Sequence, residues 1–135
     1  MTSQFLLPTK IISGTGTVAE VAREAKLFGA VRALIVTDPG LSAAGIPAVV
    51  ADQMKAGGLG VETFAEVEAD TSIATASRAA EQAKRLKADV IVAIGGGSSI
   101  DAAKSAALLA VNGGYLKDYA GVGKVDKPIM PVIAI

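Results

Sequence analysis

Apolar residues gather along the chain in four short runs, separated by stretches with helical periodicity. The runs are rich in β-branched residues and are bounded by glycine, proline or aspartate, which is typical of strands. Three runs are apolar without alternation, so both faces of their sheet are expected to be covered, as in parallel sheets. The expected strands are residues 33–37, 61–64, 89–94 and 131–135.

Between these runs apolar residues recur every three or four positions, which predicts amphipathic helices. The expected helices are residues 18–28, 46–56, 72–87 and 98–111, the last ending at the Asn112-Gly113-Gly114 signal. Because strand and helix alternate, the pattern predicts one α/β domain over residues 1–135. The expected architecture of this domain is an open, mostly parallel sheet with helices on both faces.

The composition limits the chemistry that the chain can perform. It contains no histidine and no cysteine, so it has no imidazole base, no thiolate nucleophile and no imidazole or thiolate metal ligand. Its 13 basic and 13 acidic residues cancel, which does not favour a nucleic-acid partner. These counts favour a binding domain over a complete enzyme, and we assign no catalytic residue.

The chain shows no sign of a membrane association. It has no apolar run of the roughly 18 residues that a spanning helix needs, and its first residues lack a basic region followed by an apolar run. The expected location is the cytoplasm.

The sharpest local motif follows the most apolar run. Residues 89–94 lead directly into Gly95, Gly96, Gly97 and Ser98, where a helix is expected to begin. Glycines allow close approach of a bulky ligand, and the free N–H groups of a helix N-terminus favour phosphate. The alternative is a plain turn in which Ser98 caps the helix and Asp101 completes a capping box.

A second candidate is Asp38, which follows the strand expected at residues 33–37. A carboxylate at the end of a parallel strand can accept hydrogen bonds from both ribose hydroxyls of an adenosine. It would also repel a 2′-phosphate, so Asp38 favours NAD over NADP. Taken alone, Asp38 is explained better by an ordinary Asp-Pro-Gly turn or helix start.

Two other segments are weaker candidates. Gly14 and Gly16 fit the start of a dinucleotide fingerprint, but residues 10–13 form a poor strand, so we interpret them as a turn. Glu66, Glu68 and Asp70 lack the glycines and carbonyl donors typical of a calcium loop, and we interpret them as a solvated loop.

With these motifs in place, the chain resembles the amino-terminal part of the iron-containing (group III) alcohol dehydrogenases. The stretch GGGS-x-x-D-x-x-K after an apolar strand is specific for this family and its polyol-dehydrogenase relatives. The resemblance covers essentially the whole chain and is carried by residues 5–8, 14–16, 34–41, 95–104 and 128–135.

The resemblance implies a Rossmann-like domain that binds NAD, with NADP less expected. Gly96, Gly97 and Ser98 match residues that hold the pyrophosphate, and Asp38 matches the reader of the adenosine ribose. Asp101 matches an acidic position near the nicotinamide half. Asp70 stands where the family commonly carries an asparagine near the adenine, so its contact is less secure.

The family continues into a helical second domain whose aspartate and histidines bind a divalent metal, usually iron. That domain is absent from these 135 residues, so the chain resembles a fragment: the cofactor-binding half of an enzyme that transfers hydride between an alcohol or aldehyde and NAD(P). Alone it is expected to be inactive and, with its apolar surface uncovered, to associate. The complete protein is a possible homodimer.

Two alternatives stay open at this point. The chain could be a stand-alone nucleotide-binding module without catalysis. It could also be the cofactor domain of a lyase similar to dehydroquinate synthase, which uses a similar sheet.

Overall fold

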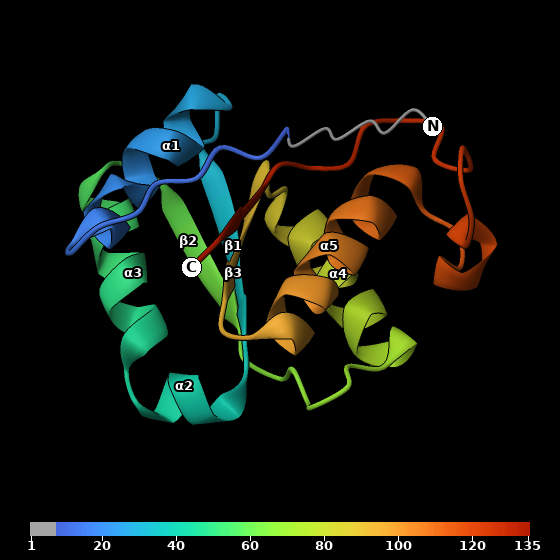
Figure 1. Ribbon diagram of the computed structural model, residues 1–135, viewed down its shortest axis with the longest axis horizontal. Helices are drawn as coiled ribbons and strands as arrows, with labels where there is room; N and C mark the ends of the chain where they lie inside the picture. The colour runs from blue at the N-terminus through green and yellow to red at the C-terminus, as the bar shows by residue number, and fades with distance from the viewer. Residues whose placement is uncertain (1–7) are drawn as a thin grey trace, which may run out of the picture.

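A computed structural model describes residues 8–135, and they form one four-stranded parallel sheet. The order across the sheet is β2-β1-β3-β4 (Figure 1). The strands are β1 (Arg32–Thr37), β2 (Gly60–Phe64), β3 (Val90–Ile94) and β4 (Val132–Ala134). All four expected strands and the α/β class are therefore confirmed. Residues 5–7, part of the first matching segment, lie outside the described residues.

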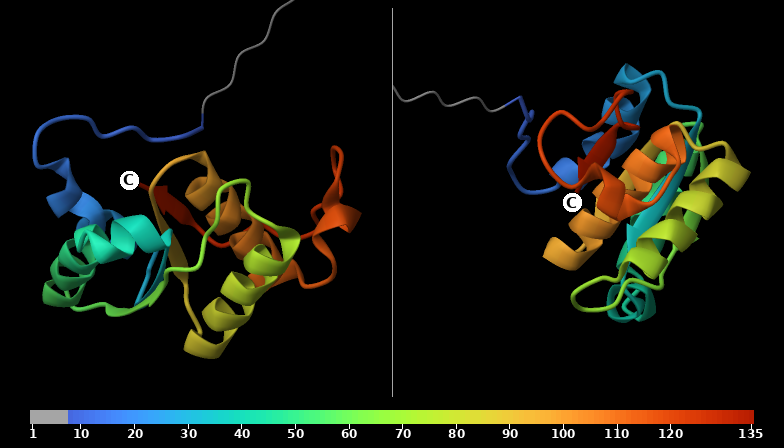
Figure 2. Two further views of the ribbon diagram at one scale, coloured as in Figure 1. Left: turned by 90° about the horizontal axis from the view of Figure 1, so that it is seen from below. Right: turned by 90° about the vertical axis from the view of Figure 1, so that its right-hand side faces the viewer.

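Helices cover both faces of the sheet. Helices α1 and α3 lie on one face and α4 and α5 on the other, as two views show (Figures 1 and 2). Alternate residues of β1 serve the two layers: Ala33 and Ile35 pack with α1 and α3, whereas Leu34 and Val36 pack with α4 and α5. The bounds are α1 (Val21–Leu27), α2 (Pro39–Ala43), α3 (Ile46–Ala56), α4 (Ile73–Leu86) and α5 (Gly97–Asn112).

Alanines form the contact between α4 and α5. Ala79, Ala80 and Ala83 of α4 and Ala103 and Ala106 of α5 are almost fully buried in one cluster. Side chains of this size let two helices lie side by side over the same strands. The alanine stripes in the sequence are thus part of the core.

The structure departs from the expected helices in two places. The helix expected at residues 18–28 begins as a 3₁₀ helix, η1 (Thr17–Glu20), before α1. The short helix α2 realises the helix-start alternative for Asp38; it forms because the Asp38 carboxylate accepts from the Leu41 N–H at 2.9 Å while Pro39 occupies the first turn. A second 3₁₀ helix, η2 (Leu116–Tyr119), follows α5, which ends at Asn112 before Gly113 with a φ of +70°.

An apolar groove of about 820 Å³ lies beside β4, between α1, α5 and the segment that precedes η1. Exposed Ile11, Leu27 and Phe28 contribute to its walls. Association through this surface stays a prediction. No helix within residues 8–135 is long and apolar enough to cross a membrane.

Candidate functional site

The site lies where the connections of the sheet diverge. From β1 the chain crosses to β2 on one side, and it later returns to β3 on the other side of β1. The carboxyl ends of β1 and β3 therefore form a switch point, which is where open α/β sheets bind ligands. The buried Thr37 hydroxyl joins these two ends by donating to the Ile94 carbonyl at 2.9 Å. Asp38 follows β1 directly, and Gly95 follows β3.

The three glycines of the loop have different reasons to be glycine. Gly95 has a φ of +135°, and a Cβ there would lie 2.8 Å from Ser99 Oγ and 3.1 Å from Leu41 Cδ1. It is therefore required by the turn itself. A Cβ at Gly96 or Gly97 would meet nothing within 4 Å. These two residues face open space.

Helix α5 begins at Gly97 without a side-chain cap. Gly96 is its N-cap residue and Ser98 is its second residue, so the alternative in which Ser98 caps the helix and Asp101 completes a capping box is wrong. Without such a cap, the first N–H groups of this 16-residue helix have no partner within the helix. They carry the positive end of the helix dipole and are available to an anion.

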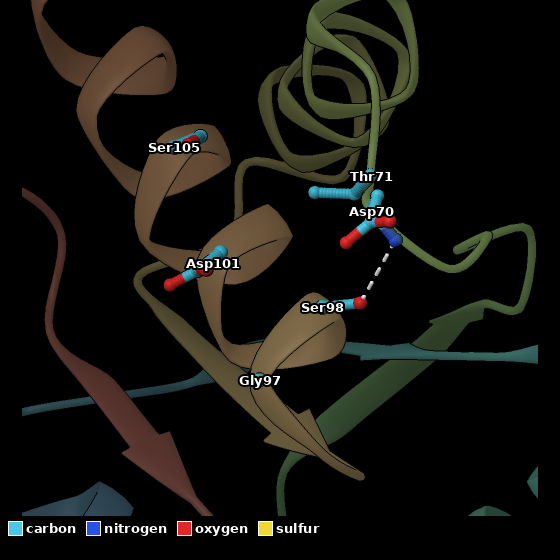
Figure 3. A pocket seen from close by; sticks show the side chains of 6 residues that line it. All are labelled: Asp70, Thr71, Gly97, Ser98, Asp101 and Ser105. Carbon is cyan, nitrogen blue, oxygen red and sulfur yellow. Dashed lines mark hydrogen bonds between the residues drawn. The ribbon is translucent and has the colours of Figure 1, made fainter.

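A pocket of about 550 Å³ opens beside this helix end (Figure 3). Ser98, Asp101 and Ser105 come from successive turns of α5, and Asp70 and Thr71 come from the loop between β2 and α4. Six residues line the pocket: Asp70, Thr71, Gly97, Ser98, Asp101 and Ser105.

Four of the seven predicted binding residues line this pocket, namely Asp70, Gly97, Ser98 and Asp101. Asp38, Gly95 and Gly96 do not, although all three lie at the same switch point. Asp38 is half-buried and caps α2 with one carboxylate oxygen, as the helix-start interpretation predicts. Its contact with a ribose stays a prediction.

Sequence reasoning did not single out Thr71 and Ser105. Ser105 had a usable signal, because it continues the polar positions Ser98 and Asp101 along one face of an otherwise alanine-rich helix. Thr71 lies in a loop, so no periodic pattern in the sequence could have indicated it. Its Oγ1 atom is buried and has no hydrogen-bond partner among the described residues.

The loop from residue 65 to residue 72 is tied to both neighbouring layers. The N–H of buried Val67 donates to the Thr37 carbonyl at 3.2 Å. The Asp70 N–H donates to Ser98 Oγ at 3.2 Å. Asp70 has a φ of +52°, which residues other than glycine rarely adopt. The loop thus carries Asp70 and Thr71 over the start of α5.

The carboxyl group of Glu68 accepts hydrogen bonds within this loop. Hydrogen bonds from Ser72 and Thr75 lower the pKa of Glu68 to about 2. Glu66, Glu68 and Asp70 are all exposed, as the interpretation of a solvated loop predicts, and the Glu68 side chain in addition holds the turn that leads into α4. Among residues 8–135, no three His, Cys, Asp or Glu side chains are grouped as a metal site.

The first glycine pair, Gly14 and Gly16, follows a segment that is not a strand and precedes η1 rather than an α-helix. A dinucleotide fingerprint needs a strand before its glycines. Neither residue lines the pocket, as the interpretation of this segment as a turn predicts.

A family model described as iron-containing alcohol dehydrogenase matches residues 8–135. The chain belongs to the iron-containing alcohol dehydrogenase family. This confirms the resemblance given by residues 34–41 and 95–104. An NAD-dependent methanol dehydrogenase from Bacillus methanolicus is 42% identical to it over 135 residues, which are 100% of this chain and 35% of the relative.

Solved structures of this dehydrogenase family have the same domain fold. The alcohol dehydrogenase from Oenococcus oeni matches with a TM-score of 0.91 at 28% identity, over 98% of this chain and 35% of its own. The sulfoacetaldehyde reductase from Bifidobacterium kashiwanohense, solved in complex with NAD+, matches with a TM-score of 0.88 at 25% identity, over 99% of this chain and 35% of its own. The chain spans about a third of the length of these relatives.

Proposed function

We propose that this chain binds NAD, with the diphosphate at the start of α5. The observation that carries the proposal is the uncapped helix end behind Gly96 and Gly97, where a Cβ would meet nothing within 4 Å. This open space lies at the switch point of the sheet, and a helix N-terminus favours an anion. The Bacillus relative is named NAD-dependent, and the Bifidobacterium relative was solved with NAD+.

The residues of the pocket fit the two chemical parts of a dinucleotide. The N–H groups of Gly97 and Ser98 would donate to the diphosphate, and the Ser98 hydroxyl would add a third donor. The carboxylates of Asp70 and Asp101 can only accept hydrogen bonds, so they fit ribose hydroxyls and repel phosphate. This division would keep the diphosphate at the helix end and hydroxyl-bearing groups farther along α5.

Asp38 is proposed to select NAD over NADP. Its Oδ1 accepts from the Leu41 N–H and so holds the carboxylate in place at the end of β1. A carboxylate fixed there would accept from the ribose hydroxyls and would repel a 2′-phosphate.

For the whole protein we propose hydride transfer between a small alcohol or aldehyde and NAD. The bound nicotinamide supplies the hydride chemistry, and the residues of this chain bind and orient it. We propose that metal ligands come from a second domain outside these 135 residues, because the chain has no histidine and spans only 35% of the Bacillus relative. We also propose that the whole protein is a homodimer in the cytoplasm. The family assignment favours a dehydrogenase over a lyase.

Calorimetric titration of the chain with NAD and NADP tests the binding proposal. We expect NAD to bind at least about tenfold more tightly, a difference of roughly 1.4 kcal/mol, because the Asp38 carboxylate would repel a 2′-phosphate. Equal affinities would remove the role of Asp38. No binding of either dinucleotide would overturn the proposed function.

A pair of glycine variants tests the location of the diphosphate. Gly97→Val should lower the NAD affinity more than about tenfold, because its side chain would fill space that is open in the structure. The control, Gly16→Ala, lies at a φ of +78° and should cost about 1 kcal/mol of stability without affecting affinity. The opposite order of affinities would move the diphosphate to the first glycine pair.

A further inference from the structure

The wall of the pocket opposite α5 is the turn from Glu68 to Ser72, and this turn is held by one carboxylate. Oε1 of Glu68 accepts from the Ser72 N–H at 3.0 Å and from the Thr75 hydroxyl at 2.8 Å. The first bond closes a ring around Asp70, whose φ of +52° a non-glycine residue rarely adopts. The second joins the ring to the first turn of α4.

A chain of hydroxyl groups supports the carboxylate. Because the Thr75 proton is donated to Glu68, the Thr75 oxygen is free to accept, and it does so from Ser72 Oγ and from Arg78 Nη2, each at 3.1 Å. Ser72 Oγ in turn accepts from the Thr75 N–H at 3.1 Å. The hydroxyl protons of Ser72 and Thr75 therefore point in series toward Glu68, the first to the Thr75 oxygen and the second to the carboxylate.

This arrangement determines what the Ser98 hydroxyl can do. A serine hydroxyl has one proton and two lone pairs. Ser98 Oγ accepts from the Asp70 N–H at 3.2 Å, and the two groups meet at the edge of the pocket (Figure 3). With one lone pair occupied by an N–H donor, the Ser98 proton is left to donate to an acceptor in the pocket. A phosphate oxygen is such an acceptor.

We propose that Glu68 is a positioning residue of the cofactor site: its carboxylate holds the 68–72 turn so that the Asp70 N–H orients the Ser98 hydroxyl as a donor toward the bound diphosphate. The proposal rests on the proposed binding of NAD. Glu68 itself is outside the pocket lining and acts only through Asp70 and Ser98.

The test is a double-mutant cycle in NAD affinity, measured by calorimetry on the full chain. Glu68→Ala should weaken binding about fivefold, the effect of misorienting one hydrogen-bond donor. In a Ser98→Ala background the same change should have no further effect, because no hydroxyl is left to orient. Losses that multiply in the double variant would overturn the proposal, since a general structural role acts independently of Ser98.

Two further variants separate the carboxylate from the loop around it. Glu68→Gln retains an acceptor oxygen and should recover most of the affinity, within about twofold of the unchanged chain. Glu66→Ala is the matched control: it removes an exposed carboxylate of the same loop, ion-paired to Arg78 at 3.2 Å, and should leave the affinity unchanged. If Glu66→Ala and Glu68→Ala weaken binding equally, the assignment to Glu68 fails.

Amide hydrogen exchange at Asp70 tests the link between Glu68 and Asp70 without any ligand. Exchange of the Asp70 N–H should be faster in Glu68→Ala than in the unchanged chain. If the alanine variant does not fold, Glu68→Asp is measured instead, because its side chain is one methylene shorter and withdraws the carboxylate from the turn. Unchanged exchange would overturn the proposal even if NAD binds. Failure of the unchanged chain to bind NAD would instead overturn the proposed function, and the exchange rates would still decide the role of Glu68.

Discussion

The two ends of the parallel sheet use their polar groups in opposite ways. At the amino end, the Asp89 carboxylate accepts from the N–H groups of Val31 and Arg32 at 2.9–3.0 Å, and the Arg32 guanidinium donates to the Lys87 carbonyl at 2.9 Å. At the carboxyl end, the first N–H groups of α5 have no side-chain cap, and the buried Thr71 hydroxyl has no partner among the described residues.

This difference separates structure from binding within one small domain. A polar group that is satisfied inside the protein stabilises the fold, whereas one left unsatisfied beside a pocket is free for a ligand. Changes at the amino end should therefore alter stability without altering affinity. Changes at the open part of the carboxyl end should do the reverse.

The largest expected effect on stability is at the amino end. Asp89→Ala should lower the free energy of unfolding by about 2–3 kcal/mol, because it removes a charged acceptor from two backbone N–H groups. Urea denaturation measures the loss, and the NAD affinity of the folded variant should be unchanged. Asp89→Asn keeps one acceptor oxygen and should lose less. An affinity change in Asp89→Ala would show that the two ends are not independent.

Neighbouring glycines at the carboxyl end should respond differently to the same methyl group. Gly95→Ala should cost about 1–3 kcal/mol of stability, because the residue has a φ of +135° and its Cβ would lie 2.8 Å from Ser99 Oγ. Gly96→Ala should change stability by less than about 0.5 kcal/mol and lower the NAD affinity, because its Cβ enters open space. Thermal unfolding and calorimetry measure the two effects. Similar stability losses in both variants would contradict this difference.

Most of the fold could be predicted from the sequence because it depends on long, regular patterns. The apolar run at residues 90–94 and the alanine stripes of α4 and α5 leave few alternatives to a covered parallel strand and its packed helices. The choice between a turn and the short helix α2 at Asp38 stayed open, because a single side-chain contact, from Asp38 to the Leu41 N–H, decides it.

The site could be predicted only where it coincides with such patterns. Gly97 and Ser98 follow the strongest strand, so their place at the pocket could be inferred from order along the chain. Thr71 and Glu68 lie in a loop whose place depends on the contacts of Asp70 with Ser98 and of Glu68 with Thr75, and these contacts have no periodic signal. A local sequence pattern cannot show which residues of another segment will face it.

The smallest expected effect on stability concerns Glu68. Its carboxylate accepts hydrogen bonds within the protein, as the Asp89 carboxylate does at the amino end. The Glu68 pKa of about 2 lies below the usual 4.5, so protonation favours the unfolded chain. Its contribution to stability is complete above about pH 4.5 and is lost as the pH falls toward 2. The effect is small because the carboxyl is exposed to water. Urea midpoints of the unchanged chain and of Glu68→Gln, which cannot titrate, should therefore converge as the pH falls from about 4.5 toward 2.

The other charged groups beside Glu68 set the control for this measurement. Arg78 contacts Thr75 and pairs with Glu66, whose carboxyl also faces this network. Glu66→Gln should keep the pH dependence of the unchanged chain if Glu68 is its source. A difference between the unchanged chain and Glu68→Gln that does not vary with pH would show that the turn is held without the charge of Glu68. The carboxyl end would then differ from the amino end more completely than the hydrogen bonds of Glu68 indicate.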